Sequence, residues 1–207
     1  LDAVLDHAGA ELKREKKTTR MFFRADDIAV RSGHFIRMMD LFVAHGVPLC
    51  LAVVPAWLSR ERWEALAPYR ASKDQFCWHL HGWRHKNHET VGKKQEFGPS
   101  RPDDLITHDL ERGVAKLAHI LKDRFSPFFT PPWNRCSQET MEILARMGIK
   151  GISRDSGARP PAPAGLPEFP VNVDLHTRRE SSPQAGWDQL FNEIQQGLIS
   201  GQCGVML

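Results

Sequence analysis

The sequence predicts an α/β fold, built as an incomplete, distorted β/α barrel in a single domain. Short apolar runs alternate strictly with longer amphipathic runs, which is typical of a parallel sheet joined by right-handed crossovers. Seven such strands fit into 207 residues, whereas a complete eight-stranded barrel takes about 250. The chain has neither a GxGxxG nor a GxxxxGK[ST] motif, which argues against a nucleotide-binding open sheet.

The predicted strands are the short apolar runs. The run VPLCLAVVP at 47–55 is continuous, as in a strand buried on both faces of a parallel sheet. The run RMFFRAD at 20–26 provides the first strand. Strands are expected at 20–26, 47–55, 76–81, 127–131, 150–154, 169–175 and, beginning there, at 204–207.

The predicted helices carry apolar residues three and four positions apart. Ser59 is a plausible N-cap for one of them, and Gly148 ends another. Helices are expected at 33–45, 59–66, 103–122, 137–147 and 186–200. Residues 86–102 form a long polar loop of the kind that is usually functional, and the proline-rich stretch 159–167 is irregular.

Composition limits the classes of protein that fit. Lys and Arg number 28 against 25 Asp and Glu, and the one basic cluster, 13–17, is short, so no nucleic-acid partner is predicted. No apolar run approaches the ~20 residues of a membrane span, and residues 1–17 look like a polar surface helix rather than a secretory signal. Because the first predicted strand begins at residue 20, we expect an N-terminal helix or extension at 1–19 and a barrel domain at 20–207.

The four cysteines indicate a reducing compartment. They stand at 50, 77, 136 and 203, form no CxxC pair and lie mostly in or beside apolar runs. Such residues are typical of reduced, buried thiols rather than of a disulfide framework or a thiolate zinc site. A cytoplasmic location is expected.

Histidine clustering is the strongest local signal. Four of the ten histidines, at 79, 81, 85 and 88, fall within ten residues. His81 and His85 are four apart, so both would face one way and could share a metal if the chain turns into a helix there. The alternative is a set of solvated loop histidines.

Adjacent carboxylates follow the first predicted strand. Asp26 and Asp27 repel each other and are poor strand residues, but at a barrel mouth they could act as one proton acceptor and one metal ligand. The alternative is a turn or a helix cap. Because Asp174 and His176 also follow a predicted strand, all these groups would gather at the C-terminal face of a parallel barrel, where active sites lie. Two histidines and one carboxylate would leave coordination positions open, as in catalytic metal sites.

Three motifs occur in a characteristic order: Phe-Arg-Ala-Asp-Asp ending at Asp27, His-Gly-Trp-Arg-His from His81 to His85, and Thr-Pro-Pro-Trp-Asn from Thr130. Together they resemble the polysaccharide deacetylase (NodB-homology) family, in a divergent bacterial branch, over residues 20–207. The resemblance implies a distorted (β/α)7 barrel that removes N- or O-acetyl groups from sugars. It implies that Asp27, His81 and His85 hold one divalent metal ion, usually zinc, that Asp26 is the general base, and that the backbone N–H at Trp133 binds the oxyanion.

The chain departs from the family pattern in its third and last motifs. Thr130 stands where the family has an Arg that steadies the base, and Arg24 or Arg154 could replace it, unless both are surface charges. The family's last motif is an apolar strand followed by Leu-His, so the general acid is expected just beyond Leu207. His176 is the substitute, unless it is an ordinary rim histidine.

These observations predict a metal-dependent carbohydrate deacetylase. Trp83, beside the histidine motif, could bind a sugar ring, although packing in the core is the alternative. The expected partner is an acetylated sugar or a precursor of a surface polysaccharide. Two other functions stay open: another metal-dependent amide hydrolase on the same barrel, and a catalytically impaired barrel that binds sugar or metal.

Overall fold

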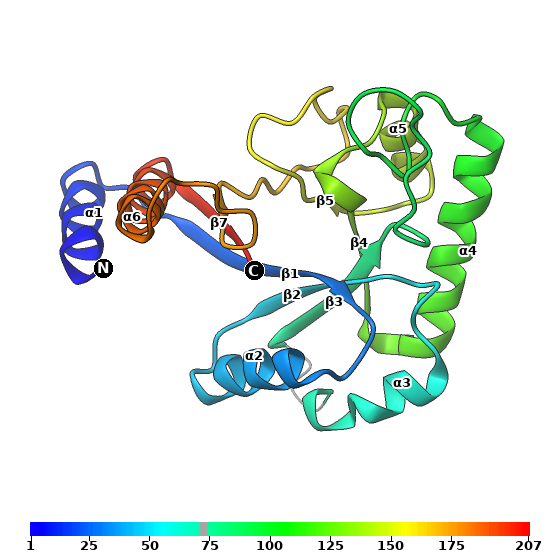
Figure 1. Cartoon of the computed structure of the whole chain (residues 1–207), viewed down its shortest axis with the longest axis horizontal. Helices are drawn as coiled ribbons and strands as arrows, with labels where there is room; N and C mark the ends of the chain where they lie inside the picture. The colour runs from blue at the N-terminus through cyan, green and yellow to red at the C-terminus, as the bar shows by residue number, and fades with distance from the viewer. Residues whose placement is uncertain (71–73) are drawn as a thin grey trace. The chain divides into compact units, whose positions relative to one another are not determined.

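The structure, a computed structural model, describes residues 1–70 and 74–207 and confirms the predicted fold class, an α/β fold of the incomplete (β/α)7 barrel type (Figure 1). Its strands are β1 (Arg20–Ile28), β2 (Leu49–Val53), β3 (Phe76–His81), β4 (Phe125–Thr130), β5 (Gly151–Ile152), β6 (Val173–Asp174) and β7 (Gln202–Met206). They are hydrogen-bonded in the order β5-β4-β3-β2-β1-β7-β6. The pairs β1–β7, β2–β3, β3–β4, β4–β5 and β6–β7 are all parallel.

Helices lie between most of the strands, as predicted. They are α1 (Asp2–Arg14), α2 (Gly33–Ala44), α3 (Arg60–Ala65), α4 (Asp103–Leu121), α5 (Gln138–Arg146) and α6 (Pro183–Ile199). Short 3₁₀ turns add η1 (Ala67–Tyr69), η2 (Lys122–Arg124) and η3 (Pro132–Asn134). The predicted cap of α3 is confirmed, because the Ser59 hydroxyl accepts a hydrogen bond from the Arg62 N–H at 3.2 Å.

Two predicted strands are much shorter than expected. Only Gly151–Ile152 of 150–154 and Val173–Asp174 of 169–175 are strands. Glu168 still forms an isolated bridge with Ile152, but Pro170 has no N–H with which to continue a ladder. Helix α6 begins three residues before the predicted 186, because Ser182 caps it and Pro183 suits the first helical position.

The chain divides into two compact units within β1. The central unit, Ala25–Phe169, contains β2 to β5 and α2 to α5. In it, α4 packs against β3 and β4, as Figure 1 shows. The apolar side chains Leu80 of β3, Leu117 of α4 and Phe129 of β4 are all fully buried. This core holds the ends of β3 and β4 in fixed positions.

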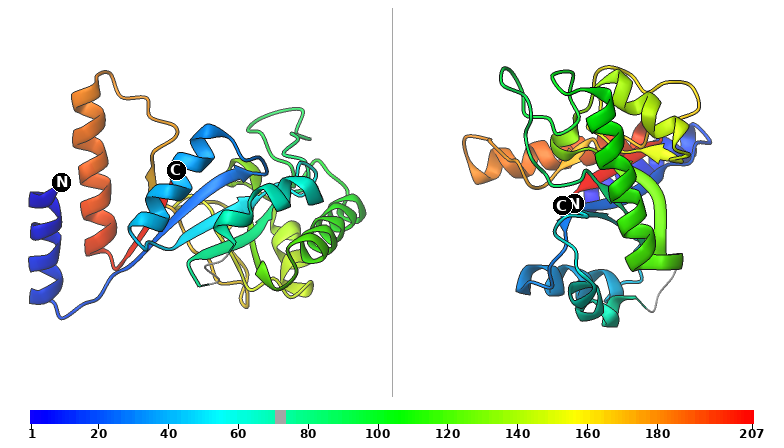
Figure 2. Two further views of the ribbon diagram at one scale, coloured as in Figure 1. Left: turned by 90° about the horizontal axis from the view of Figure 1, so that it is seen from below. Right: turned by 90° about the vertical axis from the view of Figure 1, so that its right-hand side faces the viewer.

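The terminal unit comprises Leu1–Arg24 and Pro170–Leu207. Its helices α1 and α6 lie side by side, in contact with each other (Figure 2). The first part of β1 pairs with β7 in the register Phe23 to Val205. Its core is a small apolar cluster made of Ala8, Val173, Leu198, Cys203 and Val205. Among the helices of residues 1–70 and 74–207, none is long and apolar enough to cross a membrane.

Candidate metal centre

Three side chains of the central unit converge on one point. Asp27 Oδ1 lies 3.4 Å from the Nε2 atom of His81 and 3.4 Å from that of His85. The three potential ligand atoms lie within 4.8 Å of one another. Two imidazole nitrogens and one carboxylate oxygen suit zinc and several other transition metals, and they leave coordination positions open. The residues therefore fit a divalent ion, and they are the three that the family resemblance implies.

Strand ends position two of these groups. His81 is the last residue of β3, and Asp27 precedes the last residue of β1. Asp27 has φ 60, a left-handed conformation that is uncommon for residues other than glycine but is accessible to Asp. The departure from strand geometry changes the direction of the carboxylate at the end of β1.

The orientation of His81 is fixed by the neighbouring strand. Its Nδ1 lies 2.9 Å from the main-chain oxygen of Thr130, its register partner in β4. Because a carbonyl oxygen only accepts, Nδ1 carries the proton and Nε2 is left to face Asp27. The Thr130 hydroxyl lies 2.9 Å from Nε2 of His79, so Thr130 holds two buried histidines.

A turn, not a helix, brings His85 to the site, so the helical interpretation of the His81–His85 spacing is wrong. Residues 82–85 are not helical: the chain bends at residues 83 and 84, and the flanking Gly82 and His85 have φ 60 and φ 56. The imidazole centroids of His81 and His85 are nevertheless 5.2 Å apart. A bent, non-helical segment with positive φ at Gly82 and His85 thus achieves the juxtaposition that one helical turn would give.

The side chain of Glu96 is hydrogen-bonded to the backbone of residues 83–85. Its fully buried carboxylate accepts hydrogen bonds from the backbone N–H groups of Trp83 at 3.1 Å, Arg84 at 2.7 Å and His85 at 3.2 Å. Burial raises the pKa of Glu96 even though these three donors favour its charged form. The sequence prediction missed this residue, because a Glu in a polar, glycine-punctuated loop carries no signal of burial.

Gly82 yields a stability prediction. A Cβ there would lie 2.1 Å from Glu96 Oε2 and 2.7 Å from Pro132 Cγ, in a backbone with φ +60. We expect Gly82→Ala to lower the free energy of unfolding by about 2–5 kcal/mol, combining left-handed strain with overpacking. Gly46→Ala is the matched control, because Gly46 has φ +62 and open space around its Cβ position. Urea unfolding should give the control a loss of only about 1–2 kcal/mol; equal losses would contradict the crowding at Gly82.

Charges of the cluster act on one another. Burial raises the pKa of Asp27, but the hydrogen bond and charge of His81, with the charge of His85, outweigh it and hold that pKa below its usual value. Burial lowers the pKa of His81, yet Asp27 and Asp26 raise it above its usual value. For His85, burial prevails and lowers the pKa. The charge of Asp26, the next residue to Asp27 in the chain, also acts on all three groups.

Aromatic rings surround His85. Its centroid lies 4.4 Å from that of Trp133 and 5.9 Å from that of Trp57, a residue that the sequence prediction did not select. Trp133 has φ 57 in the turn η3 and is partly exposed. Trp83 is 6% exposed, with the Arg112 guanidinium 4.7 Å from its ring centroid, so it offers a ligand little surface.

Both candidate arginines are fully buried, so the alternative that they are surface charges is wrong. In the terminal unit, Arg24 Nη2 lies 3.1 Å from Met206 Sδ. In the central unit, Arg154 donates from Nε to Glu168 at 2.7 Å. The Nη1 and Nη2 atoms of Arg154 are buried and have no hydrogen-bond partner among the described residues. A buried guanidinium with two such groups is suited to bind an anion or a carbonyl oxygen.

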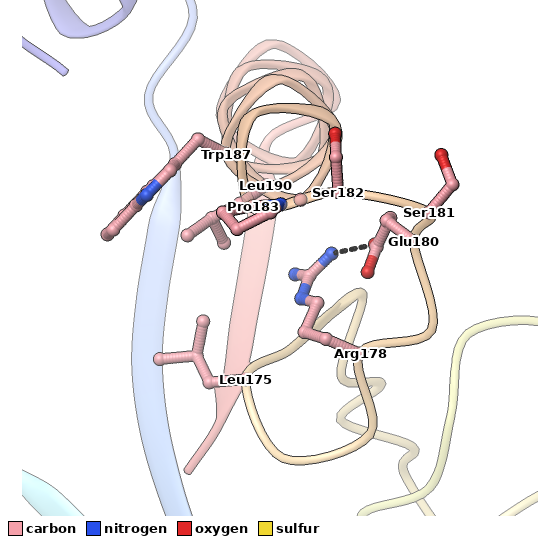
Figure 3. Close-up of a pocket in the computed structure, with 9 residues that line it drawn as sticks. Leu175, Arg178, Glu180, Ser181, Ser182, Pro183, Trp187 and Leu190 are labelled. Carbon is pink, nitrogen blue, oxygen red and sulfur yellow. Dashed lines mark hydrogen bonds and ion pairs between the residues drawn. The ribbon is translucent and has the colours of Figure 1, made fainter.

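His176 belongs to the terminal unit, where it is exposed on a turn held by Asp174. The Asp174 carboxylate accepts hydrogen bonds from the N–H groups of His176 at 2.7 Å and Thr177 at 2.9 Å. This unit also contains a pocket of about 560 Å³ (Figure 3). The pocket includes Trp187 and the ion pair Arg178–Glu180, but not His176. Asp174 therefore acts as a turn residue, and a catalytic role for His176 stays a prediction.

No family model and no curated protein sequence matches the chain. Several solved structures, however, match the fold of this chain. A CE4 family pseudoenzyme from Bacillus anthracis aligns with a TM-score of 0.59 at 12% identity, covering 91% of this chain and 54% of that one. IcaB from Ammonifex degensii aligns with a TM-score of 0.58 at 16% identity, covering 86% and 72%. The T48 deacetylase, solved with substrate, aligns with a TM-score of 0.55 at 11% identity, covering 92% and 75%.

These likenesses establish the fold. The chain has the fold of CE4 structures and spans about half the length of the pseudoenzyme, 54%. Both a pseudoenzyme and a deacetylase share this fold, so the fold alone does not decide whether a chain is active.

Proposed function

We propose that the chain is a metal-dependent carbohydrate deacetylase whose barrel domain comprises residues 20–207. Asp27, His81 and His85 would hold one divalent ion, with zinc as the first choice. The observation that carries this proposal is the convergence of Asp27 Oδ1 with two Nε2 atoms, one of them oriented by Thr130. The likeness to CE4 structures and the three sequence motifs support it.

The residues around the centre suit hydrolysis of an acetyl group. A bound zinc ion would supply a water molecule with a pKa of about 7 and would polarise the acetyl carbonyl. Asp26, whose charge acts on His81, would accept the proton of the attacking water. The backbone N–H of Trp133 donates to the oxygen of the tetrahedral intermediate. A role for His176 in protonating the leaving group stays a prediction.

Sugar recognition belongs to the exposed aromatic rings and a buried arginine. Trp57, 38% exposed, and Trp133 flank His85 and offer faces on which a sugar ring can stack. A substrate-binding role for Trp83 stays a prediction that the burial of its ring argues against. Arg154, with two unpartnered N–H groups, is the stronger candidate of the two arginines to steady the base or the substrate; a role for Arg24 stays a prediction.

A product assay tests the proposal. The zinc-loaded protein should release acetate from N-acetylated glucosamine oligomers or O-acetylated xylan, and chelation should abolish the release until zinc is restored. Acetate formed at the same rate by the chelated protein would overturn metal dependence.

The same assay separates the two alternatives. Release of a different acid from other amides would instead favour another amide hydrolase. Metal or sugar binding without any released acid would favour an impaired barrel, the alternative that the pseudoenzyme of the same fold keeps relevant.

A further inference from the structure

Two cysteines face each other across neighbouring strands at the end of the sheet opposite His81. Cys50 in β2 and Cys77 in β3 are Cα partners in a parallel register. Adjacent strands lie about 4.7–4.9 Å apart, within the Cα separation of about 4.4–6.8 Å that a disulfide requires. Paired residues project to the same face of a sheet, so the two thiols lie on one side. Both residues are partly exposed, whereas Cys136 and Cys203 are buried.

The surroundings of Cys77 favour its thiolate. Interactions with Cys50, the first cause, and with His79 and Ser126 lower the pKa of Cys77 against the opposing effect of burial. The other two thiols behave in the opposite way. Burial raises the pKa of Cys136 to about 12 and also raises that of Cys203. Partial exposure and a lowered pKa thus distinguish Cys77, beside its register partner Cys50, from the two buried thiols.

We propose that Cys50 and Cys77 form an oxidation site, at which hydrogen peroxide converts the two thiols into a disulfide between β2 and β3. The Cys77 sulfur attacks one peroxide oxygen, the O–O bond breaks, and the departing hydroxide takes a proton to become water. The Cys50 sulfur then attacks the resulting sulfenic acid, the S–O bond breaks, and a second water leaves. The thiols lose two electrons and two protons in all, and the peroxide gains both.

This site is distinct from the metal centre and does not rest on the proposed deacetylase activity. Cys77 precedes His81 by four residues along β3, which corresponds to about 13 Å of extended strand. Both nitrogens of the intervening His79 already have partners, the Thr130 hydroxyl at 2.9 Å and the Cys77 carbonyl at 3.4 Å. A metal shared by Cys50, Cys77 and His79 is therefore less well supported than a disulfide.

The experiment is peroxide treatment of the whole protein at neutral pH, followed by non-reducing digestion and mass spectrometry. We expect a cross-linked peptide pair containing Cys50 and Cys77, lighter by two hydrogens, while Cys136 and Cys203 stay free thiols. The pair should oxidise at least about tenfold faster than Cys136. Comparable oxidation of all four cysteines, or loss of the Cys50 and Cys77 thiols without a cross-link between them, would overturn the proposal.

Variants assign the two roles. In Cys50→Ser the Cys77 sulfenic acid should accumulate and be trapped by dimedone, because the resolving thiol is absent. In Cys77→Ser the fast reaction should disappear. The double variant Cys136→Ser, Cys203→Ser is the matched control and should form the cross-link at the original rate. The peptide map of the unmodified protein already shows whether Cys50 and Cys77 become cross-linked. The proposal can therefore be tested even if a variant fails to fold.

Discussion

Replacing His81 with alanine is expected to lower zinc affinity by more than about 100-fold and to abolish acetate release. His81 offers a buried Nε2 whose direction is fixed by the hydrogen bond from Nδ1 to Thr130, and alanine removes this ligand atom altogether. Equilibrium dialysis with zinc analysis measures the affinity directly, without relying on turnover.

Two further variants complete this experiment. His85→Ala should also lose zinc, because its Nε2 lies 3.4 Å from the same Asp27 oxygen. His88→Ala is the control, since His88 belongs to the same histidine-rich segment but lies outside the three-residue cluster. If the His81 and His85 variants both keep wild-type zinc stoichiometry, the metal site lies elsewhere.

Asp26→Asn is expected to lower the rate constant of acetate release by about 10²–10⁴-fold while zinc stays bound. The amide has nearly the size of the carboxylate but cannot accept a proton from water. Asp27→Asn is the paired variant, and it should instead release zinc. Zinc content and acetate release, measured on both variants, distinguish a base from a ligand. If Asp26→Asn loses zinc and regains activity in excess zinc, the roles of the two aspartates are reversed.

Periodicity was sufficient to predict most of the fold. The continuous apolar run at 47–55 contains β2, and the run Phe76–His81 is β3 without any change of bounds. These strands are buried in the middle of the sheet, where hydrophobic patterning is strongest. The region from 150 to 175 was predicted less well, because its prolines interrupt pairing that the apolar residues alone would indicate.

The candidate metal ligands could be predicted from the sequence, but the residue that holds His85 in position could not. Residue type and spacing pointed to His81 and His85, and the resemblance to the deacetylase family selected Asp27 rather than Asp26 as the third ligand. The support of His85 by Glu96 depends on a loop that folds back over eleven residues, and no local pattern encodes that. The spacing of four was correctly linked to proximity, although the backbone between the histidines is not helical.

The hydrogen bond from His81 to Thr130 has an evolutionary consequence. Its acceptor is a main-chain oxygen, which every amino acid at position 130 would provide. A point mutation there changes the partner of His79 but leaves the acceptor for His81 in place. The direction of the His81 imidazole therefore depends on the pairing of β3 with β4 and not on the side chain at position 130. Substitutions at position 130 should leave this direction unchanged as long as the two strands keep their register.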